Sequence, residues 1–191
     1  MLSKRLKIIN DTYEYLSING LKNLTMNALL KYLNISKGSF YHYFKSKDEL
    51  ISNLFFTILD LHIIENKSKI EDSNSLREKL EILYNLYLVD TEENKIFIDL
   101  YKDFLLTYGN NDNEFVNLYN KKYKDIFSKV LYKIIQKEIK NGVIKEDSLS
   151  TINIVMTTAD GMMMYSSSFE QFDLSKEFSI FLDFYIESIK I

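Results

Sequence analysis

Side chains with recognisable binding chemistry cluster between positions 37 and 43, in the run Lys-Gly-Ser-Phe-Tyr-His-Tyr. On a short helix, Phe40 and Phe44 would lie four residues apart on one face and turn inward. The other positions are small or carry hydrogen-bonding groups, which suit the DNA major groove of about 12 Å width. The predicted DNA-contacting face is Lys37, Gly38, Ser39, Tyr41, His42 and Tyr43.

The glycine in this run needs a reason, because Gly inside a helix is less favourable than Ala by about 1 kcal/mol. Close approach of Gly38 to a phosphate backbone would be one reason. Close packing of Gly38 against the first helix is the alternative, and the sequence leaves both open.

Apolar spacing predicts the helices that must position this face. Intervals of four and three residues predict a first helix over about 3–19. Its expected buried face is Leu2, Leu6, Ile9, Tyr13 and Leu16. Thr25 is a suitable N-cap for a second helix. The buried face of that helix would be Met26, Leu29, Leu30 and Leu33. A three-residue turn at 34–36 leads to a short helix over about 37–44, and two short helices joined in this way form a helix-turn-helix.

The rest of the chain also favours helices. Pro is absent and Gly occurs five times, which leaves little material for tight hairpins. Residues 46–49 form a capping box that opens a helix to about Lys67, and a polar break follows at 72–74. Further helices are expected near 75–89, 94–108, 113–141, 147–169 and 174–190. We expect an all-α chain with a helix-turn-helix domain over 1–48, a linking helix over 46–67, and a second helical domain over 68–191.

The charge distribution is uneven although the net charge is only −3. Residues 1–50 hold eight basic and four acidic residues, whereas the remainder holds 16 basic and 23 acidic residues. A basic head on an acidic body is typical of a small DNA-binding module attached to another domain, although chance scatter can give the same counts.

Catalytic and metal-binding motifs are missing from the sequence. There is no Cys, and His42 and His62 are the two histidines. The patterns H-E-x-x-H, G-x-S-x-G and G-x-x-x-x-G-K-[ST] do not occur. We expect no enzyme, no catalytic residue, no metal and no cofactor.

The N-terminus does not resemble a secretory signal, because Asn10, Asp11 and Glu14 interrupt any apolar segment. The most apolar later stretches, near 54–64 and 152–165, contain charged residues and are too short to span a membrane. We expect a cytoplasmic protein without a membrane partner.

Residues 25–50 resemble the DNA-binding signature of the TetR family of bacterial regulators. The run Ser-Lys-Gly-Ser-Phe-Tyr-His-Tyr-Phe-Lys-Ser-Lys-Asp-Glu-Leu at 36–50 carries the resemblance. Leu30 departs from the family pattern, where a small residue is usual, and so does Asn34, where Gly is usual. The resemblance implies that the side chains of the short third helix approach DNA and that Thr25 and Lys47 anchor phosphates.

The same resemblance implies that the C-terminal helices bind a ligand and form a homodimer. Aromatic residues at helical spacing there are either ordinary core or the wall of an apolar pocket. The candidate pocket residues are Tyr84, Tyr87, Phe97, Tyr101, Phe104, Tyr108, Tyr123, Phe127 and Met156. The last two helices are apolar on more than one face, which favours pairing between copies. The candidate dimer residues are Gly161, Met164, Tyr165, Phe178, Phe181, Leu182 and Tyr185.

These features together predict a ligand-responsive transcriptional regulator. The expected partners are a palindromic DNA operator, a second copy of the chain, and a small apolar or aromatic effector that releases a repressor from DNA. Control by a protein partner, action without any effector, and activation are the alternatives.

Overall fold

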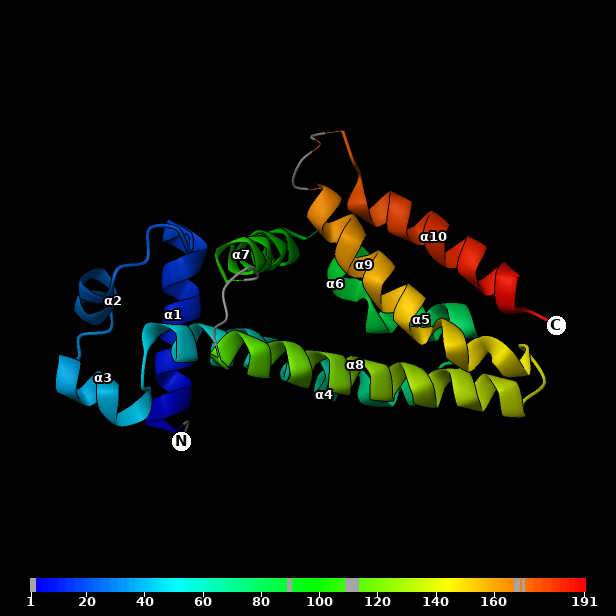
Figure 1. Cartoon of the computed structure of the whole chain (residues 1–191), viewed down its shortest axis with the longest axis horizontal. Coiled ribbons are helices and arrows are strands. Elements are labelled where there is room, and N and C mark those ends of the chain that lie inside the picture. The colour runs from blue at the N-terminus through cyan, green and yellow to red at the C-terminus, as the bar shows by residue number, and fades with distance from the viewer. Residues whose placement is uncertain (1–2, 89–90, 109–113, 167–168, 170) are drawn as a thin grey trace. The chain divides into compact units, whose positions relative to one another are not determined.

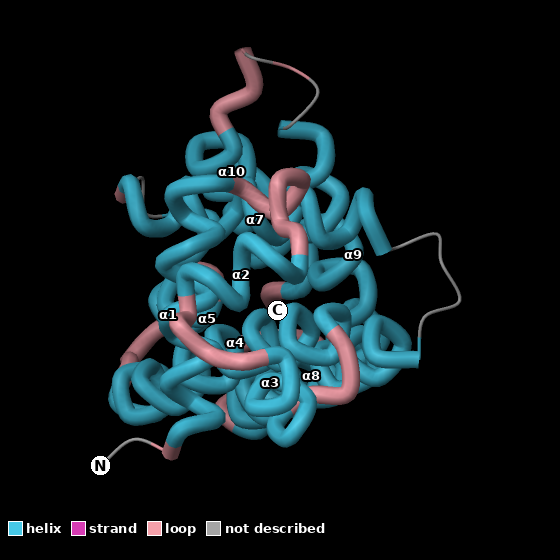
Figure 2. The backbone as a smooth tube through the Cα atoms, turned by 90° about the vertical axis from the view of Figure 1, so that its left-hand side faces the viewer, coloured by secondary structure: helices cyan, strands magenta, loops and turns pink. Residues whose placement is uncertain are grey.

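The computed structural model describes residues 3–88, 91–108, 114–166, 169 and 171–191 (Figure 1). These residues form helices joined by loops, as Figure 2 shows, and the described part of the chain contains no strand. The predicted all-α fold is confirmed. The helices are α1 (Lys4–Asn19), α2 (Met26–Tyr32), α3 (Lys37–Tyr43), α4 (Lys47–Asp72), α5 (Leu76–Leu83), α6 (Asn85–Leu88), α7 (Glu92–Tyr108), α8 (Glu114–Lys140), η1 (Glu146–Thr151), α9 (Ile152–Ser166) and α10 (Leu174–Ile189).

The chain divides into two compact units. The first takes Met1–Asp60 and Asp99–Lys122, and the second takes Leu61–Ile98 and Tyr123–Ile191. Helices α4, α7 and α8 therefore contribute residues to both units. These units are defined by packing and not by function. The predicted division into a DNA-binding domain over 1–48 and a second helical domain over 68–191 therefore stays a prediction.

The core of the first unit forms around the inward faces of α1 to α4. The buried residues of α1 are Ile8, Ile9, Thr12, Tyr15 and Leu16. Two residues of the predicted stripe, Leu6 and Tyr13, are only half-buried, and Leu2 lies outside the described residues. The buried face is thus turned slightly from the predicted one. Thr12 belongs to it because its hydroxyl donates to the Ile8 carbonyl at 2.7 Å.

The second unit differs from the predicted helices at two places. The helix predicted over 75–89 is interrupted at Tyr84, which has φ −104° and ψ 21° and a fully buried side chain. The helix predicted over 147–169 begins instead as the 3₁₀ segment η1, and α9 follows from Ile152. The capped turn between α4 and α5 agrees with the predicted polar break, because the Ser75 hydroxyl accepts from the Glu78 amide at 3.1 Å.

None of the described helices is long and apolar enough to cross a membrane.

Candidate nucleic-acid interface

Two N-caps build the helix-turn-helix. The Thr25 hydroxyl accepts from the Ala28 amide at 3.2 Å at the start of α2. The Ser36 hydroxyl accepts from the Ser39 amide at 3.1 Å at the start of α3. Each cap satisfies an amide that the first turn of a helix leaves without a partner, and so fixes where the helix begins.

The turn between α2 and α3 depends on one left-handed residue. Asn34 has φ 49°, the only positive value among the described non-glycine residues. Asn tolerates this conformation better than most residues other than Gly. The predicted turn is confirmed, with Asn34 in place of the glycine that the resemblance led us to expect.

Two phenylalanines hold α3 in place. The side chains of Phe40 and Phe44 are buried, and their ring centroids lie 5.7 Å apart. On the rest of the helix, Lys37 and His42 are exposed, Tyr41 is 46% exposed, and Ser39 and Tyr43 are half-buried. The predicted outward face of α3 therefore carries one cation and several hydrogen-bonding groups.

Gly38 does not pack against the first helix. A Cβ added at this position would meet only the Ser36 hydroxyl, at 4.0 Å. The structure thus contradicts the packing explanation for this glycine, and the space beside its backbone stays open.

Two lysines lie close to aromatic rings of α3, Lys4 from α1 and Lys37 from α3 itself. The Lys4 ammonium lies 5.8 Å from the Tyr43 ring centroid, and the Lys37 ammonium lies 6.0 Å from that of Tyr41. Sequence analysis named Lys37 but did not place Lys4 in the candidate interface. The basic residues at 4–7 were the only sequence feature that indicated a DNA contact by Lys4. A solvated N-terminus would show the same basic residues.

The predicted capping box at the start of α4 is present in a shifted form, because Glu49 reaches the amide of Lys45, one residue before the N-cap Ser46. The Ser46 hydroxyl accepts from the Glu49 amide at 3.0 Å, and the Glu49 carboxylate accepts from the Lys45 amide at 2.5 Å. Lys47 has a second role, because its ammonium donates to the Leu24 carbonyl at 3.0 Å. This bond ties the start of α4 to the loop before α2 and leaves two donors on the ammonium group.

Comparison with known proteins identifies this segment. A family model described as bacterial regulatory proteins of the tetR family matches residues 8–54, which include the whole helix-turn-helix. Residues 8–54 therefore carry the DNA-binding segment of the TetR family of bacterial regulators. A relative in Bacillus subtilis (strain 168), the uncharacterized HTH-type transcriptional regulator YvdT, is 27% identical over 161 residues, covering 81% of this chain and 79% of YvdT.

Solved structures of TetR regulators share the fold of this chain. A TetR transcription regulator from Haloarcula marismortui has a TM-score of 0.77 at 17% identity, covering 98% of both chains. A TetR-family transcriptional regulator from Cytophaga hutchinsonii has a TM-score of 0.74 at 18% identity, covering 100% of this chain and 98% of the other. At these identities the likeness shows the fold.

The predicted pocket residues fall into both compact units of the chain. Tyr101 and Phe104 pack on Phe55 in the first unit, with ring centroids 5.6 and 4.8 Å away. The second unit holds Tyr84, Tyr87, Phe97, Tyr123, Phe127 and Met156. All eight of these residues are buried, and the side chain of Tyr108 lies outside the described part.

A polar group that sequence analysis did not select lies in the second unit. The Tyr123 hydroxyl donates to the Asp160 carboxylate at 3.2 Å. Burial raises the pKa of Asp160 to about 6, although the Tyr123 bond and Lys124 act in the opposite direction. The Tyr84 hydroxyl is buried without a hydrogen-bond partner among the described residues, and burial raises its pKa. The position of Asp160 as the one acidic residue within the apolar run 152–165 could have indicated a buried polar group.

The predicted dimer residues differ in how far the protomer buries them. Phe178, Leu182 and Tyr185 lie in the core of the protomer itself. Gly161 is exposed, Tyr165 is 48% exposed, and Met164 and Phe181 are half-buried. Sequence analysis did not select Phe184, although it is 74% exposed on α10. The sequence feature that could have indicated Phe184 was its position outside the main apolar face of that helix.

No group of three side chains suited to holding a metal ion occurs within the part of the chain that the structure describes.

Proposed function

We propose that this TetR-family regulator is a repressor that binds a palindromic operator as a dimer and is released by a small apolar or aromatic effector. The outward face of α3, held by the buried rings of Phe40 and Phe44, is the observation that carries the proposal. It presents hydrogen-bonding groups on a rigid helix, as sequence-selective contact with base edges requires.

In the proposed complex α3 enters the major groove. Lys37, Ser39, Tyr41 and His42 contact base edges, and Tyr43 lies at the margin of the contact. Gly38 supports the close approach of DNA because no side chain of the protein fills the space beside it. Thr25 and Lys47 hold phosphates at the starts of α2 and α4, where the positive end of the helix dipole favours anions.

Dimer formation is proposed through α9 and α10. Exposed apolar side chains on these helices, including Phe184, Tyr165 and Ile154, give a second copy an apolar surface to cover. Gly161 would permit close helix contact, since a Cβ there would meet nothing within 4 Å in the protomer. A two-fold dimer would place two reading helices about 34 Å apart along DNA.

The effector is proposed to bind among the predicted pocket residues that lie in the second unit. Release from DNA requires that it bind the DNA-free conformation more tightly than the DNA-bound one, because equal affinity shifts no population. The buried hydroxyl of Tyr84 and the carboxylate of Asp160 supply polar groups that an aromatic effector could use.

Fluorescence anisotropy on the chain's own upstream intergenic DNA tests DNA binding. We expect selective binding over scrambled DNA, with two protomers per site and a steep loss of affinity with salt. The double variant Tyr41→Ala/His42→Ala should fold normally and lose selective binding. Tyr132→Ala is the matched control, because this exposed tyrosine lies on α8. Equal binding by wild type and the double variant would show that the assigned face is wrong.

Control by a protein partner, or action without an effector, is the second candidate. Dense ring packing in the second unit favours it, because packed rings leave less space for an effector. The ring centroid of Tyr84 lies 6.0 Å from that of Phe127 and 5.1 Å from that of Phe178. Loss of operator affinity on adding an aromatic effector would decide for the first candidate. Activation in place of repression is distinguished by a reporter fused to the bound promoter.

A further inference from the structure

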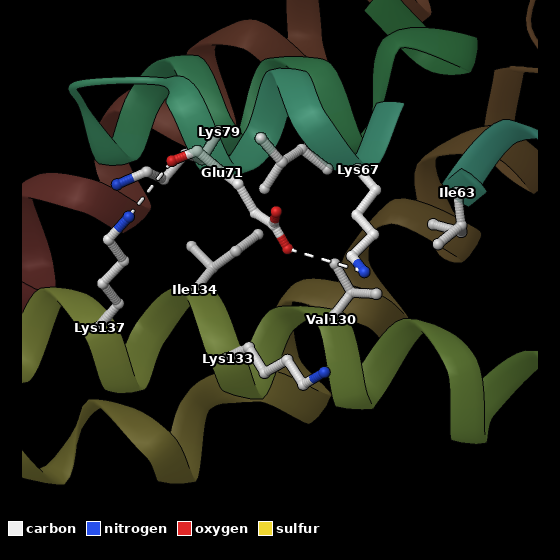
Figure 3. Close-up of a pocket in the computed structure, with 9 residues that line it drawn as sticks. Ile63, Lys67, Glu71, Lys79, Val130, Lys133, Ile134 and Lys137 are labelled. Atoms are coloured by element: carbon white, nitrogen blue, oxygen red, sulfur yellow. Dashed lines mark hydrogen bonds and ion pairs between the residues drawn. The ribbon is translucent and has the colours of Figure 1, made fainter. Parts of the chain in front are cut away.

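A groove of about 330 Å³ runs between α4 and α8 in the second unit (Figure 3). Its apolar floor is formed by Ile63 and Ile70 of α4 and by Val130 and Ile134 of α8. Its volume lies in the range of small-molecule sites. None of the residues predicted to contact DNA or the effector lines it.

The rim of the groove is strongly cationic. Four lysines line it, Lys67, Lys79, Lys133 and Lys137, against one acid, Glu71. Lys79 is already neutralised by an ion pair with Glu138, so three lysines face a single carboxylate.

These three lysines are weakly compensated within the protein. The Lys67 ammonium lies 4.0 Å from the Glu71 carboxylate, and Lys137 donates to the Glu71 backbone carbonyl at 3.3 Å. Lys133 is exposed and has no ion pair or hydrogen bond among the described residues. Figure 3 shows Lys67 on α4 and Lys133 on α8 reaching into the middle part of the groove, between Ile63 and Lys137.

We propose that this groove binds an anionic amphiphile, an apolar chain that ends in a carboxylate, sulfate or phosphate. The chain lies along the isoleucine and valine floor and removes it from water. The anionic head lies between Lys67 and Lys133, where it supplies the charge that Glu71 alone does not. A narrow concave floor bounded by two helices fits one chain rather than a flat membrane surface.

The proposal goes beyond the proposed function, because no residue proposed to bind DNA or the effector lines this groove. Binding at the groove is measured on the free protein without DNA. Isothermal titration calorimetry of the full chain with monomeric dodecanoate is the primary measurement. We expect saturable binding that becomes about fourfold tighter per methylene from octanoate to dodecanoate, the change given by burial of one methylene. Dodecanol and dodecyltrimethylammonium, with the same chain and no negative charge, should bind at least fivefold more weakly.

Variants place the ligand in this groove. Lys67→Gln/Lys133→Gln should weaken dodecanoate binding about two- to thirtyfold, the loss expected for two exposed charge contacts. Lys129→Gln/Lys176→Gln is the matched control, because it removes two exposed lysines that do not line the groove. Val130→Gln should also weaken binding while both lysines remain, and circular dichroism melting of each variant checks its folding.

Several results would overturn the proposal. They are absence of dodecanoate binding, equal binding of dodecanol, and equal loss of affinity in the groove and control variants. Binding to anionic vesicles without binding to dodecanoate would assign the lysines to a membrane surface instead, and would also refute the site.

Discussion

Replacing Glu138 by glutamine tests the buried ion pair that joins α5 and α8. Lys79 and Glu138 form this pair, and each side chain is 4% exposed. Glu138→Gln leaves the Lys79 ammonium in the same place without a counter-charge. Because water and salt reach so little of either group, screening cannot replace the lost partner.

The expected loss is about 3–5 kcal/mol in the free energy of unfolding, the usual result of removing one member of a buried pair. For a chain of this length that corresponds to a fall in Tm of roughly 6–20 °C. Urea unfolding followed by circular dichroism measures the change, at one fixed protein concentration because the proposed dimer would add to stability. The double variant Lys79→Met/Glu138→Leu removes both charges and should recover most of the loss or exceed wild type.

Glu187→Gln is the matched control, because its partner Lys190 and Glu187 itself are both largely exposed. It should change stability by less than about 1 kcal/mol. The reasoning is refuted if Glu138→Gln falls in that same small range, since the pair would then be solvated in solution.

Three further changes have defined outcomes. Gly38→Ala should stabilise the folded protein by up to about 1 kcal/mol, because α3 has room for the Cβ, yet weaken operator binding; melting and anisotropy check the two effects. Asp160→Asn should raise stability at pH 7: with its pKa raised to about 6, Asp160 contributes stability below about pH 4 that is lost as pH rises to about 6, and urea unfolding at pH 5 and 7 measures that slope. Phe184→Ser should shift the chain toward monomer in sedimentation velocity, whereas Ile18→Ser, at an equally exposed position on α1, should not. Unchanged affinity, unchanged pH slope and an unchanged dimer would contradict the respective arguments.

The helix-turn-helix was predictable because its signals are local. Thr25 and Ser36 cap helices within three residues of their partners, and Asn34 provides the left-handed turn next to them. Phe40 and Phe44 report the buried face of α3 through their spacing alone. Such short-range features depend little on the rest of the chain.

The features that were missed depend on residues far apart in sequence. Lys79 and Glu138 are separated by 59 positions, and no local pattern pairs them. The interruption at Tyr84 arises where its ring enters the core of the second unit, and tertiary packing of this kind overrides helix propensity. Periodicity also marked α10 as apolar on several faces, but it could not tell that Phe178 meets the chain's own core while Phe184 stays exposed.

The hydroxyl of Tyr84 has a consequence for how this sequence can evolve. It is buried without a partner among the described residues, a state that costs about 1–3 kcal/mol. Phenylalanine fills the same space without that polar atom and is one nucleotide substitution away. A mutant library selected only for heat resistance should therefore be enriched in Tyr84→Phe. A library selected for switching by a small molecule should retain tyrosine if an inducer uses that oxygen. Sequencing the survivors of both selections therefore shows whether function or stability determines the residue at position 84.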